Sequence, residues 1–261
     1  MGIITLTTDF GTRDPYVGVM KGVIAQIAPA TQVVDITHEI EGQQIMAAAF
    51  VLRQTIAWFP RGTVHVAVVD PGVGSARRIL AAQYAGQIVL VPDNGLITLV
   101  HRDFRLEDAR SVEERRYMLP SLSTTFHGRD IFAPVAAHLS TGLPLARVGP
   151  FAAELATLNM MRPAIAEDHV ISGQIVYVDR FGNLVSNIAR GELLTTYKHR
   201  RGVQVFLNEH CLGPIRGSYH EAPAGTPLAL IGSTELVEVA VNCGSAAEHF
   251  QLGVGAAIVL R

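Results

Sequence analysis

The spacing of apolar residues changes once along this chain of 261 residues, and that change decides what the chain can fold into. Over residues 1–150, short apolar runs alternate with longer segments whose apolar residues recur at helical spacing. Repeated strand, loop and helix predict a mostly parallel sheet with helices on its faces. After about residue 165, short strands follow one another with little helical periodicity between them. This second pattern predicts a compact antiparallel β domain, either a barrel or a sandwich.

The apolar runs also predict the individual elements. In the first part we expect strands at 2–8, 33–36, 63–69 and 88–91, and helices at 16–27, 43–59 and 131–139. In the second part the expected strands are 171–178, 203–207, 228–231, 236–241 and 255–260. In the first helix, Val19, Val23 and Ile27 recur at helical spacing. We place the two domains at 1–163 and 168–261, with a hinge around Pro163.

Composition narrows the class of protein. Apolar residues make up 49% of the chain and charged residues 17%, so a sizeable core is available. The net charge is −2 with acidic and basic residues interleaved, which argues against a nucleic-acid or anionic-membrane surface. No apolar run reaches the roughly 18 residues of a membrane span and no signal peptide is visible, so a cytoplasmic location is expected. Cys211 and Cys243 are expected to be reduced, mostly buried thiols.

Three carboxylates directly follow predicted strands, namely Asp9, Asp70 and Asp179. In an α/β sheet, ligands bind beyond the carboxyl ends of the strands, so these side chains are well placed to face a cleft. The alternative is that each Asp caps a turn or a helix, which is common for this residue type. The sequence alone leaves both interpretations open.

Common catalytic motifs are missing or incomplete. Gly72 and Gly74 resemble the start of a dinucleotide-binding GxGxxG motif, but Arg77 stands where the third glycine belongs. No P-loop, GxSxG or HExxH motif occurs, which argues against the commonest nucleotide hydrolases, serine hydrolases and zinc proteases. His127 lies in a polar loop before a predicted helix, where a histidine is more often structural than catalytic. Composition and spacing therefore predict an α/β plus β protein with an acidic cleft.

A more specific pattern is carried by stretches that follow one another along the chain. They are TTDFG at 7–11 with Asp14, VDPGVG at 69–74 with Arg77, PDNGL at 92–96, FHGRDIFAP at 126–134, DRFGNL at 179–184, and EVAVN at 238–242 with Ser233. In these stretches the chain resembles the S-adenosylmethionine (SAM) hydroxide adenosyltransferases, SAM hydrolases related to the fluorinase and chlorinase. The resemblance implies a Rossmann-like, mostly parallel N-terminal domain and a smaller C-terminal antiparallel β-barrel. It also implies a homotrimer that binds substrate between the N-terminal domain of one subunit and the C-terminal domain of the next.

The resemblance assigns roles to residues of this chain. The group that holds and activates the attacking water would be Asp70, Arg77 and His127. Asp9 would hold the ribose diol. The remaining substrate contacts would be Asp14, Asp179 and Ser233 at the methionine end, Asn183 and Tyr219 at the adenine, and Glu238 near the ligand. Halogenating relatives do not keep the Asp70, Arg77 and His127 set, which favours hydrolysis, although Gly232-Ser233-Thr234-Glu235 departs from the family pattern at the methionine end.

The implied reaction is hydrolysis of SAM to adenosine and L-methionine, by in-line attack of an activated water or hydroxide on ribose C5′. A sulfonium leaves as a neutral thioether, so the reaction needs no general acid, and we expect no metal and no cofactor. Positioned proton transfer is typically worth about 10²–10⁴-fold, and either Asp70 or His127 could be the acceptor.

Three other functions fit parts of the same residue set. A metal-dependent phosphoesterase would use Asp9, Asp70, His127 and Asp179 as ligands. A non-catalytic adenosylmethionine- or nucleoside-binding module would bind the ligand without turnover. A halide-dependent transferase would need chloride or a similar anion. All of these hypotheses share a small-molecule ligand.

Overall fold

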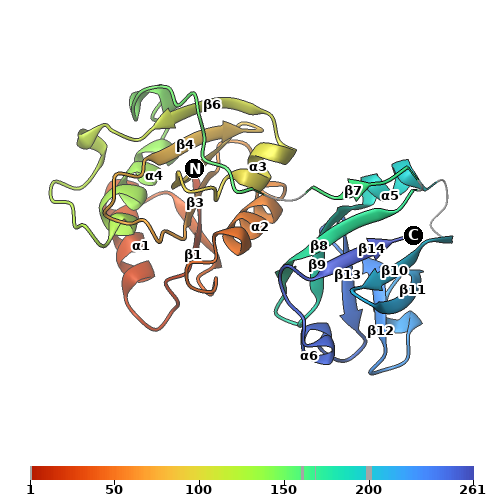
Figure 1. Cartoon of the computed structure of the whole chain (residues 1–261). Coiled ribbons are helices and arrows are strands. Elements are labelled where there is room, and N and C mark those ends of the chain that lie inside the picture. Colours follow the sequence, from red (N-terminus) through yellow and green to blue (C-terminus); the bar gives the residue numbers. More distant parts are fainter. Residues whose placement is uncertain (1, 160–161, 168, 198–201) are drawn as a thin grey trace. The chain divides into compact units, whose positions relative to one another are not determined.

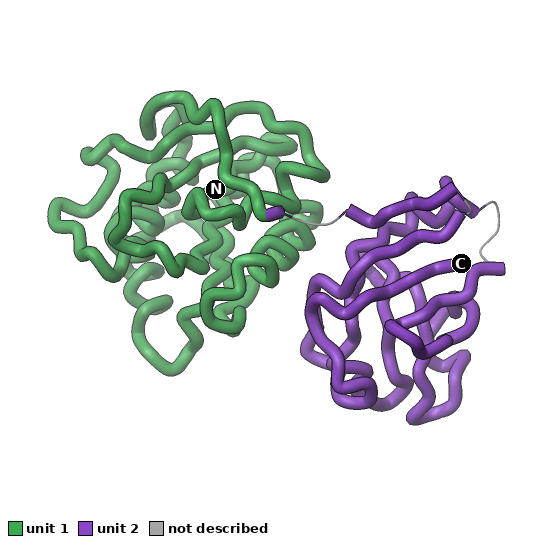
Figure 2. Tube along the Cα trace, in the orientation of Figure 1, with its two compact units in different colours: residues 1–158 green, residues 159–261 purple. Residues whose placement is uncertain are grey.

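The computed structural model describes residues 2–159, 162–167, 169–197 and 202–261. The chain forms two compact units, the first ending at Leu158 and the second running from Asn159 to Arg261 (Figure 2). The first unit is a mixed α/β fold and the second a β-barrel, and each is described by itself. No helix in the described ranges is both long enough and apolar enough to cross a membrane.

The first unit contains a mixed sheet of six strands in the order β2-β1-β3-β5-β4-β6. The strands are β1 Ile3–Thr8, β2 Gln32–Thr37, β3 Val64–Val68, β4 Ile79–Tyr84, β5 Gln87–Pro92 and β6 Leu106–Ser111. The pairs from β2 to β5 are parallel, whereas β4 is antiparallel to both β5 and β6. Ala85 and Gly86 join β4 to β5 with φ values of 50° and 71°. Positive φ at both central residues is typical of a two-residue hairpin turn, which forces the antiparallel pair.

Helices cover both faces of this sheet (Figure 1). Helices α1, Tyr16–Ile27, and α4, Ala133–Ser140, pack on one face, and α2, Ile45–Ile56, and α3, Thr98–Asp103, on the other. Because both faces are covered, every residue of β3 is buried, as the continuous apolar run predicts.

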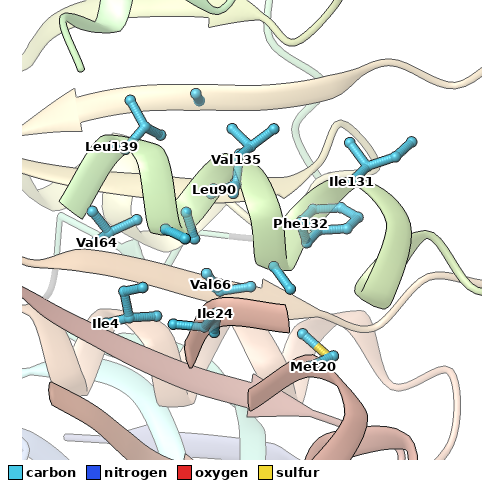
Figure 3. Close-up of a cluster of buried hydrophobic side chains, with 14 of the residues drawn as sticks. Ile4, Met20, Ile24, Val64, Val66, Leu90, Ile131, Phe132, Val135 and Leu139 are labelled. Atoms are coloured by element: carbon cyan, nitrogen blue, oxygen red, sulfur yellow. The ribbon is translucent and has the colours of Figure 1, made fainter. Parts of the chain in front are cut away.

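The core on the α1 and α4 face shows how these elements meet. Figure 3 shows Met20 of α1 and Val135 of α4 lying over Ile4 and Val66 of the central strands. The buried side of α1 consists of Val17, Met20, Val23 and Ile24. The expected helix is confirmed, and of its predicted apolar residues Val23 is buried and Ile27 packs against the core, but Val19 is 38% exposed.

The topology of the sheet singles out one end of the molecule for ligand binding. From β1 the chain passes through α1 to β2 on one side, and from β2 it passes through α2 to β3 on the other side. The direction of winding therefore reverses between β1 and β3. At such a switch point the connections leave in opposite directions, which opens a crevice at the carboxyl ends of the two strands. Asp9 and Asp70 follow these two strands directly.

The second unit is a closed barrel rather than a sandwich. Its strands are β7 Ala164–Ile165, β8 Ile171–Val178, β9 Leu184–Ala189, β10 Gln204–Leu207, β11 His210–Arg216, β12 Pro227–Ile231, β13 Leu236–Val241 and β14 Ala257–Leu260. The seven strands from β8 to β14 close on themselves because β14 pairs with both β10 and β8. All pairings are antiparallel except β11 with β12. The short helices α5, Arg190–Thr196, and α6, Ala246–Phe250, complete the unit.

The expected strands and helices are all present, with shorter bounds in several cases. The helix expected at 43–59 begins only at Ile45, because Gln43 has a φ of 66° that a helix cannot accommodate. Strands β4, β6, β7, β9 and β11 and helices α3, α5 and α6 were not predicted. Burial of the thiols was a wrong prediction, since Cys211 on β11 and Cys243 in the turn after β13 are free and exposed.

Candidate active site

A cavity of about 290 Å³ opens at the switch point of the sheet. Three polar side chains that the sequence singles out line it, namely Asp9 after β1, Asp70 after β3, and His127 before α4. The other lining residues are Phe10, Gln43, Val68, Pro71, Val73, Thr125, Phe126 and Gly128. A larger cavity of about 690 Å³ includes Arg61 but neither a carboxylate nor a histidine. A cavity of about 470 Å³ in the barrel is lined by Glu221, His210 and His249, but by none of the predicted site residues.

Asp70, Arg77 and His127 form one hydrogen-bonded group. Arg77 Nε donates to Asp70 Oδ1 at 2.8 Å, and Arg77 Nη2 forms an ion pair with Asp70 Oδ2. The same Nη2 donates to His127 Nδ1 at 2.9 Å. Only 4% of the Asp70 side chain and 10% of the Arg77 side chain are exposed. The guanidinium therefore fixes the carboxylate and the imidazole relative to each other.

The contact with Arg77 also sets the protonation state of His127. A guanidinium has donors and no acceptor, so His127 Nδ1 must be the acceptor in this bond. Neutral His127 consequently carries its proton on Nε2. Burial and the adjacent Arg77 charge lower the pKa of His127, and this outweighs the opposing effect of Asp70. At neutral pH the imidazole is therefore a neutral hydrogen-bond donor through Nε2.

The loop from Asp70 to Arg77 is held by its own turns. Val73 N donates to Asp70 O at 3.2 Å, and the Ser75 hydroxyl donates to Gly72 O at 2.7 Å while accepting from Arg77 N at 3.3 Å. Gly74 has a φ of 79°, and a Cβ there would lie 2.4 Å from Thr124 O. The glycine thus permits the Arg77 loop to pack against the loop that carries His127, and this close approach accounts for it without a bound dinucleotide.

Aromatic side chains build the cavity wall beside His127. Phe10, Tyr16 and Phe126 pack against one another with ring centroids 5.0–5.9 Å apart. A Cβ at Gly128 would lie 3.1 Å from both Met20 Sδ and a ring carbon of Phe10. Phe10 and Phe126 were not among the predicted site residues. Their only signal in the sequence is that each stands next to one of the polar candidates, Asp9 or His127.

The two remaining acidic candidates of the first unit differ in position. Asp9 lines the cavity, and its Oδ2 accepts a hydrogen bond of 3.1 Å from Gln43 N. The positive φ of Gln43 turns this N–H toward the carboxylate, which no sequence pattern indicates. Asp14 is exposed on the segment before α1 and does not line the cavity. The structure therefore brings Asp9, but not Asp14, to the Asp70 group.

In the second unit, Asp179 and Asn183 form the turn between β8 and β9. Asp179 Oδ1 accepts from Phe181 N at 2.8 Å and from Asn183 N at 2.9 Å, and Oδ2 accepts from Asn183 Nδ2 at 2.8 Å. Gly182 has a φ of 80° in this turn. Asp179 therefore organises its own loop, which is the turn-capping alternative that the sequence left open.

Tyr219 and Glu238 face the same region of the barrel. Tyr219 donates its hydroxyl proton to Glu238 Oε1 at 2.5 Å. Burial and the nearby Asp179 charge raise the pKa of Glu238, and burial together with Glu238 raises that of Tyr219. Ser233 is exposed and follows Gly232 in the turn after β12. A Cβ at Gly232 would lie 2.0 Å from Glu238 Oε2, so this turn packs directly on the Glu238 carboxyl group. The predicted residues of the barrel thus collect around one buried carboxyl group.

The same geometry bears on the metal-dependent hypothesis. Within the part of the chain that the structure describes, no three His, Cys, Asp or Glu side chains are grouped so as to hold a metal ion. Both oxygens of Asp70 already face the guanidinium of Arg77. A cation next to that guanidinium would be repelled, so the cavity suits a neutral or negatively charged oxygen better.

Comparison with known proteins finds one family for the whole chain. Residues 4–149 match the SAM hydroxide adenosyltransferase N-terminal domain, and residues 173–259 match its C-terminal domain. A Thermus thermophilus protein named (R)-S-adenosyl-L-methionine hydrolase is 40% identical over 261 residues, covering 95% of each chain. A fluorinase of an Actinoplanes species is 28% identical over 291 residues, covering 99% of this chain and 97% of the fluorinase. The crystal structure of an uncharacterized conserved protein from Thermotoga maritima superposes with a TM-score of 0.92 at 35% identity, covering 98% of this chain and 99% of that one.

Proposed function

This chain belongs to the SAM hydroxide adenosyltransferase family, and from that premise we infer that it hydrolyses SAM to adenosine and L-methionine. The name of the Thermus relative specifies the (R) configuration, and we propose the same sulfonium epimer as the substrate here. The observation that carries the chemistry is the bidentate Arg77 that joins Asp70 to His127 at the edge of a cavity.

The reacting water lies between Asp70 and His127 in this proposal. The water oxygen attacks ribose C5′ while the C5′–S bond breaks, and the bonding electrons go to sulfur, which leaves as the neutral thioether of methionine. Attack must be in line with the breaking bond, so fixing the nucleophile is the main task of the protein. The ion pair with Arg77 holds the Asp70 carboxylate in place. The negative charge of that carboxylate stabilises the positive charge that develops on the water oxygen as the C5′–O bond forms.

The tautomer of His127 assigns the proton transfer. Because Nε2 carries the proton of the neutral ring, His127 donates to the water oxygen and cannot accept from it. Asp70, which lines the cavity, remains as the proton acceptor. A sulfonium leaving group permits the proton to leave late, so the acceptor need not be a strong base. The proton then passes to solvent.

The other predicted residues serve binding. Asp9 accepts from the two ribose hydroxyls, since an ionised carboxylate has acceptors for both. The barrel residues Asp179, Asn183, Tyr219 and Glu238 hold the adenine and methionine ends, with the exposed Ser233 and Asp14 as outer contacts. The reaction requires no metal and no cofactor, because neither leaving group nor nucleophile needs a Lewis acid.

We propose a homotrimer in which the Asp70 cavity of one subunit and the barrel residues of the next bind one substrate molecule. The small volume of the cavity supports this, since about 290 Å³ is at the lower limit of typical ligand sites. The N-terminal sheet would then bind its ligand at the switch point, as Rossmann-like sheets do. A cytoplasmic location fits the two free thiols, which stay reduced there.

Incubating the purified protein with each sulfonium epimer of SAM, and following adenosine by chromatography, tests the proposed function. We expect adenosine from the (R) epimer, at a rate that neither EDTA nor chloride changes. Loss of activity in EDTA would favour the metal-dependent phosphoesterase, a requirement for chloride would favour halide transfer, and ligand-induced stabilisation without adenosine would favour a binding module.

Mixing inactive variants tests the shared site. His127→Ala and Glu238→Ala subunits, each inactive alone, should regain part of the activity when they are co-expressed, because some interfaces then contain both intact surfaces. Light scattering should give the mass of three chains. A monomer with full activity would contradict the trimer without affecting the proposed reaction.

A further inference from the structure

Asp130 is a fully buried carboxylate that the proposed reaction does not use. Its side chain is 0% exposed, in the middle of the π-helical turn Gly128–Phe132. Asp130 Oδ2 accepts from Ser123 N at 2.7 Å, and Oδ1 accepts from Arg129 Nε at 2.5 Å. A buried charge is costly unless it is paired and hydrogen-bonded, so a carboxylate kept here needs a reason beyond packing.

The contacts of Asp130 close the loop that carries His127. Its side chain binds the backbone of Ser123, its carbonyl oxygen accepts from Leu119 N at 2.9 Å, and its own N–H donates to Phe126 O at 3.2 Å. These bonds join Asp130 to Leu119, Ser123 and Phe126, which lie on both sides of Thr124. Thr124 is the residue whose carbonyl packs against Gly74 of the Arg77 loop. The carboxylate therefore fixes the surface on which the two catalytic loops meet.

Asp130 also belongs to the small set of charges that face His127. Arg77 contacts the imidazole and is paired with Asp70, while Asp130, which is paired with Arg129, acts on it through its charge. The charge of Asp130 raises the pKa of His127, against the larger effects of burial and Arg77 that lower it. Asp130 itself stays ionised, because its hydrogen bonds from Arg129 and Ser123 outweigh burial and lower its pKa.

We propose that Asp130 is the positioning residue for His127, holding the 119–130 loop against the Arg77 loop so that His127 Nδ1 meets Arg77 Nη2. This inference rests on the proposed function, since it gives Asp130 its role through the water-binding imidazole. Asp130 does not line the cavity and does not touch the reacting atoms.

The test is Asp130→Asn, which keeps the shape of the side chain and removes its charge. An amide can accept from only one of the two donors that now bind the carboxylate, and its NH₂ group opposes the other. We expect kcat to fall about 10- to 100-fold with little change in KM, because the misplaced imidazole affects the reacting water and not substrate binding. The acid limb of the kcat profile should also move to lower pH, because loss of the Asp130 charge lowers the pKa of His127 further.

Two further variants keep the test decisive. Asp103→Asn is the matched control, because Asp103 is also paired with the preceding arginine, Arg102, at 2.6 Å, but lies on α3 away from the cavity. It should leave kcat and the acid limb unchanged. Arg129→Gln should move the acid limb to higher pH, because it removes the positive charge that is paired with Asp130. Since the Arg129 side chain is 38% exposed, we expect this variant to fold.

The outcomes separate this inference from the proposed function. Wild-type kcat and an unshifted acid limb in Asp130→Asn would overturn the positioning role, as would a rise in KM with kcat unchanged. If Asp130→Asn does not fold, an unshifted limb in Arg129→Gln overturns it instead. An active His127→Ala enzyme would contradict the proposed function itself, whereas an inactive His127→Ala beside a normal Asp130→Asn would contradict only this inference.

Discussion

Replacing Arg77 by lysine removes the fork that joins Asp70 to His127 while the positive charge stays. The arginine makes two bonds to the carboxylate and one to the imidazole, through Nε and Nη2. A lysine ammonium is a point donor that cannot span both groups in this geometry. Arg77→Lys should therefore keep one contact with Asp70 and lose two, including the bond that fixes the tautomer of His127.

The size of the effect follows from the bonds that are lost. A hydrogen bond to a charged group contributes about 1.5–3 kcal/mol, so two of them correspond to about 3–6 kcal/mol. If that amount is lost in the transition state, kcat falls about 10²- to 10⁴-fold, since about 1.4 kcal/mol is a factor of ten. KM should change little, because Arg77 does not line the cavity.

Steady-state release of adenosine, followed by chromatography, gives both kcat and KM for this variant. Arg78→Lys is the matched control, because Arg78 is the next residue, 44% exposed, and pairs with Asp93 instead. A lysine at position 78 keeps the positive charge beside Asp93 and makes no contact with Asp70 or His127, so the control should stay near wild-type activity. An Arg77→Lys enzyme with kcat within about threefold of wild type would refute the reasoning, because the fork would then be dispensable.

Three further predictions concern binding, pH and backbone conformation. Tyr219→Phe, which removes the hydroxyl that donates to Glu238, should raise KM more than it lowers kcat, and equal losses in both would contradict a binding role. The free energy of unfolding should decrease as pH falls below 6.5, because burial lowers the pKa of His65 in the folded state and the unfolded chain then binds one more proton. Each such group changes the free energy of unfolding by about 1.4 kcal/mol per pH unit. Denaturant titrations of wild type and His65→Gln at several pH values measure this change. Gly74→Ala should lower Tm and kcat together, because a φ of 79° costs a residue with a Cβ about 1–2 kcal/mol and the new Cβ would collide with Thr124 O. A wild-type Tm would show that the two loops do not need this close approach.

The fold could be predicted where the burial of a strand by itself determines which residue types the strand contains. Strand β3, buried on both faces, has a continuous apolar sequence that predicts it within one residue at each end. Strand β11 contains Gly213 and Pro214, which argue against a strand, and it forms because β10 and β12 supply partners on either side. Strands whose stability comes from neighbours rather than from their own composition cannot be found from the local sequence.

The candidate site was predictable in its residue types and not in its geometry. Asp9 and Asp70 could be placed together because parallel strands share their carboxyl ends. The position of His127 beside Arg77 depends on the packing of two loops that are 50 residues apart in sequence. The tautomer of His127, and hence the assignment of the proton acceptor, follows from that single contact and has no signal in the sequence. Asp130 was visible only as part of a motif, because its role depends on the backbone of Ser123.

The measurement that tests the central claim most directly is hydrolysis of (R)-SAM in water labelled with oxygen-18, with EDTA present and the adenosine analysed by mass spectrometry. Attack of an enzyme-held water on ribose C5′ places one labelled oxygen in the 5′-hydroxyl of every adenosine molecule, and His127→Ala should abolish this product. Adenosine without the label, or label incorporated at the same rate by the His127→Ala protein, would contradict a water held and activated by Asp70, Arg77 and His127.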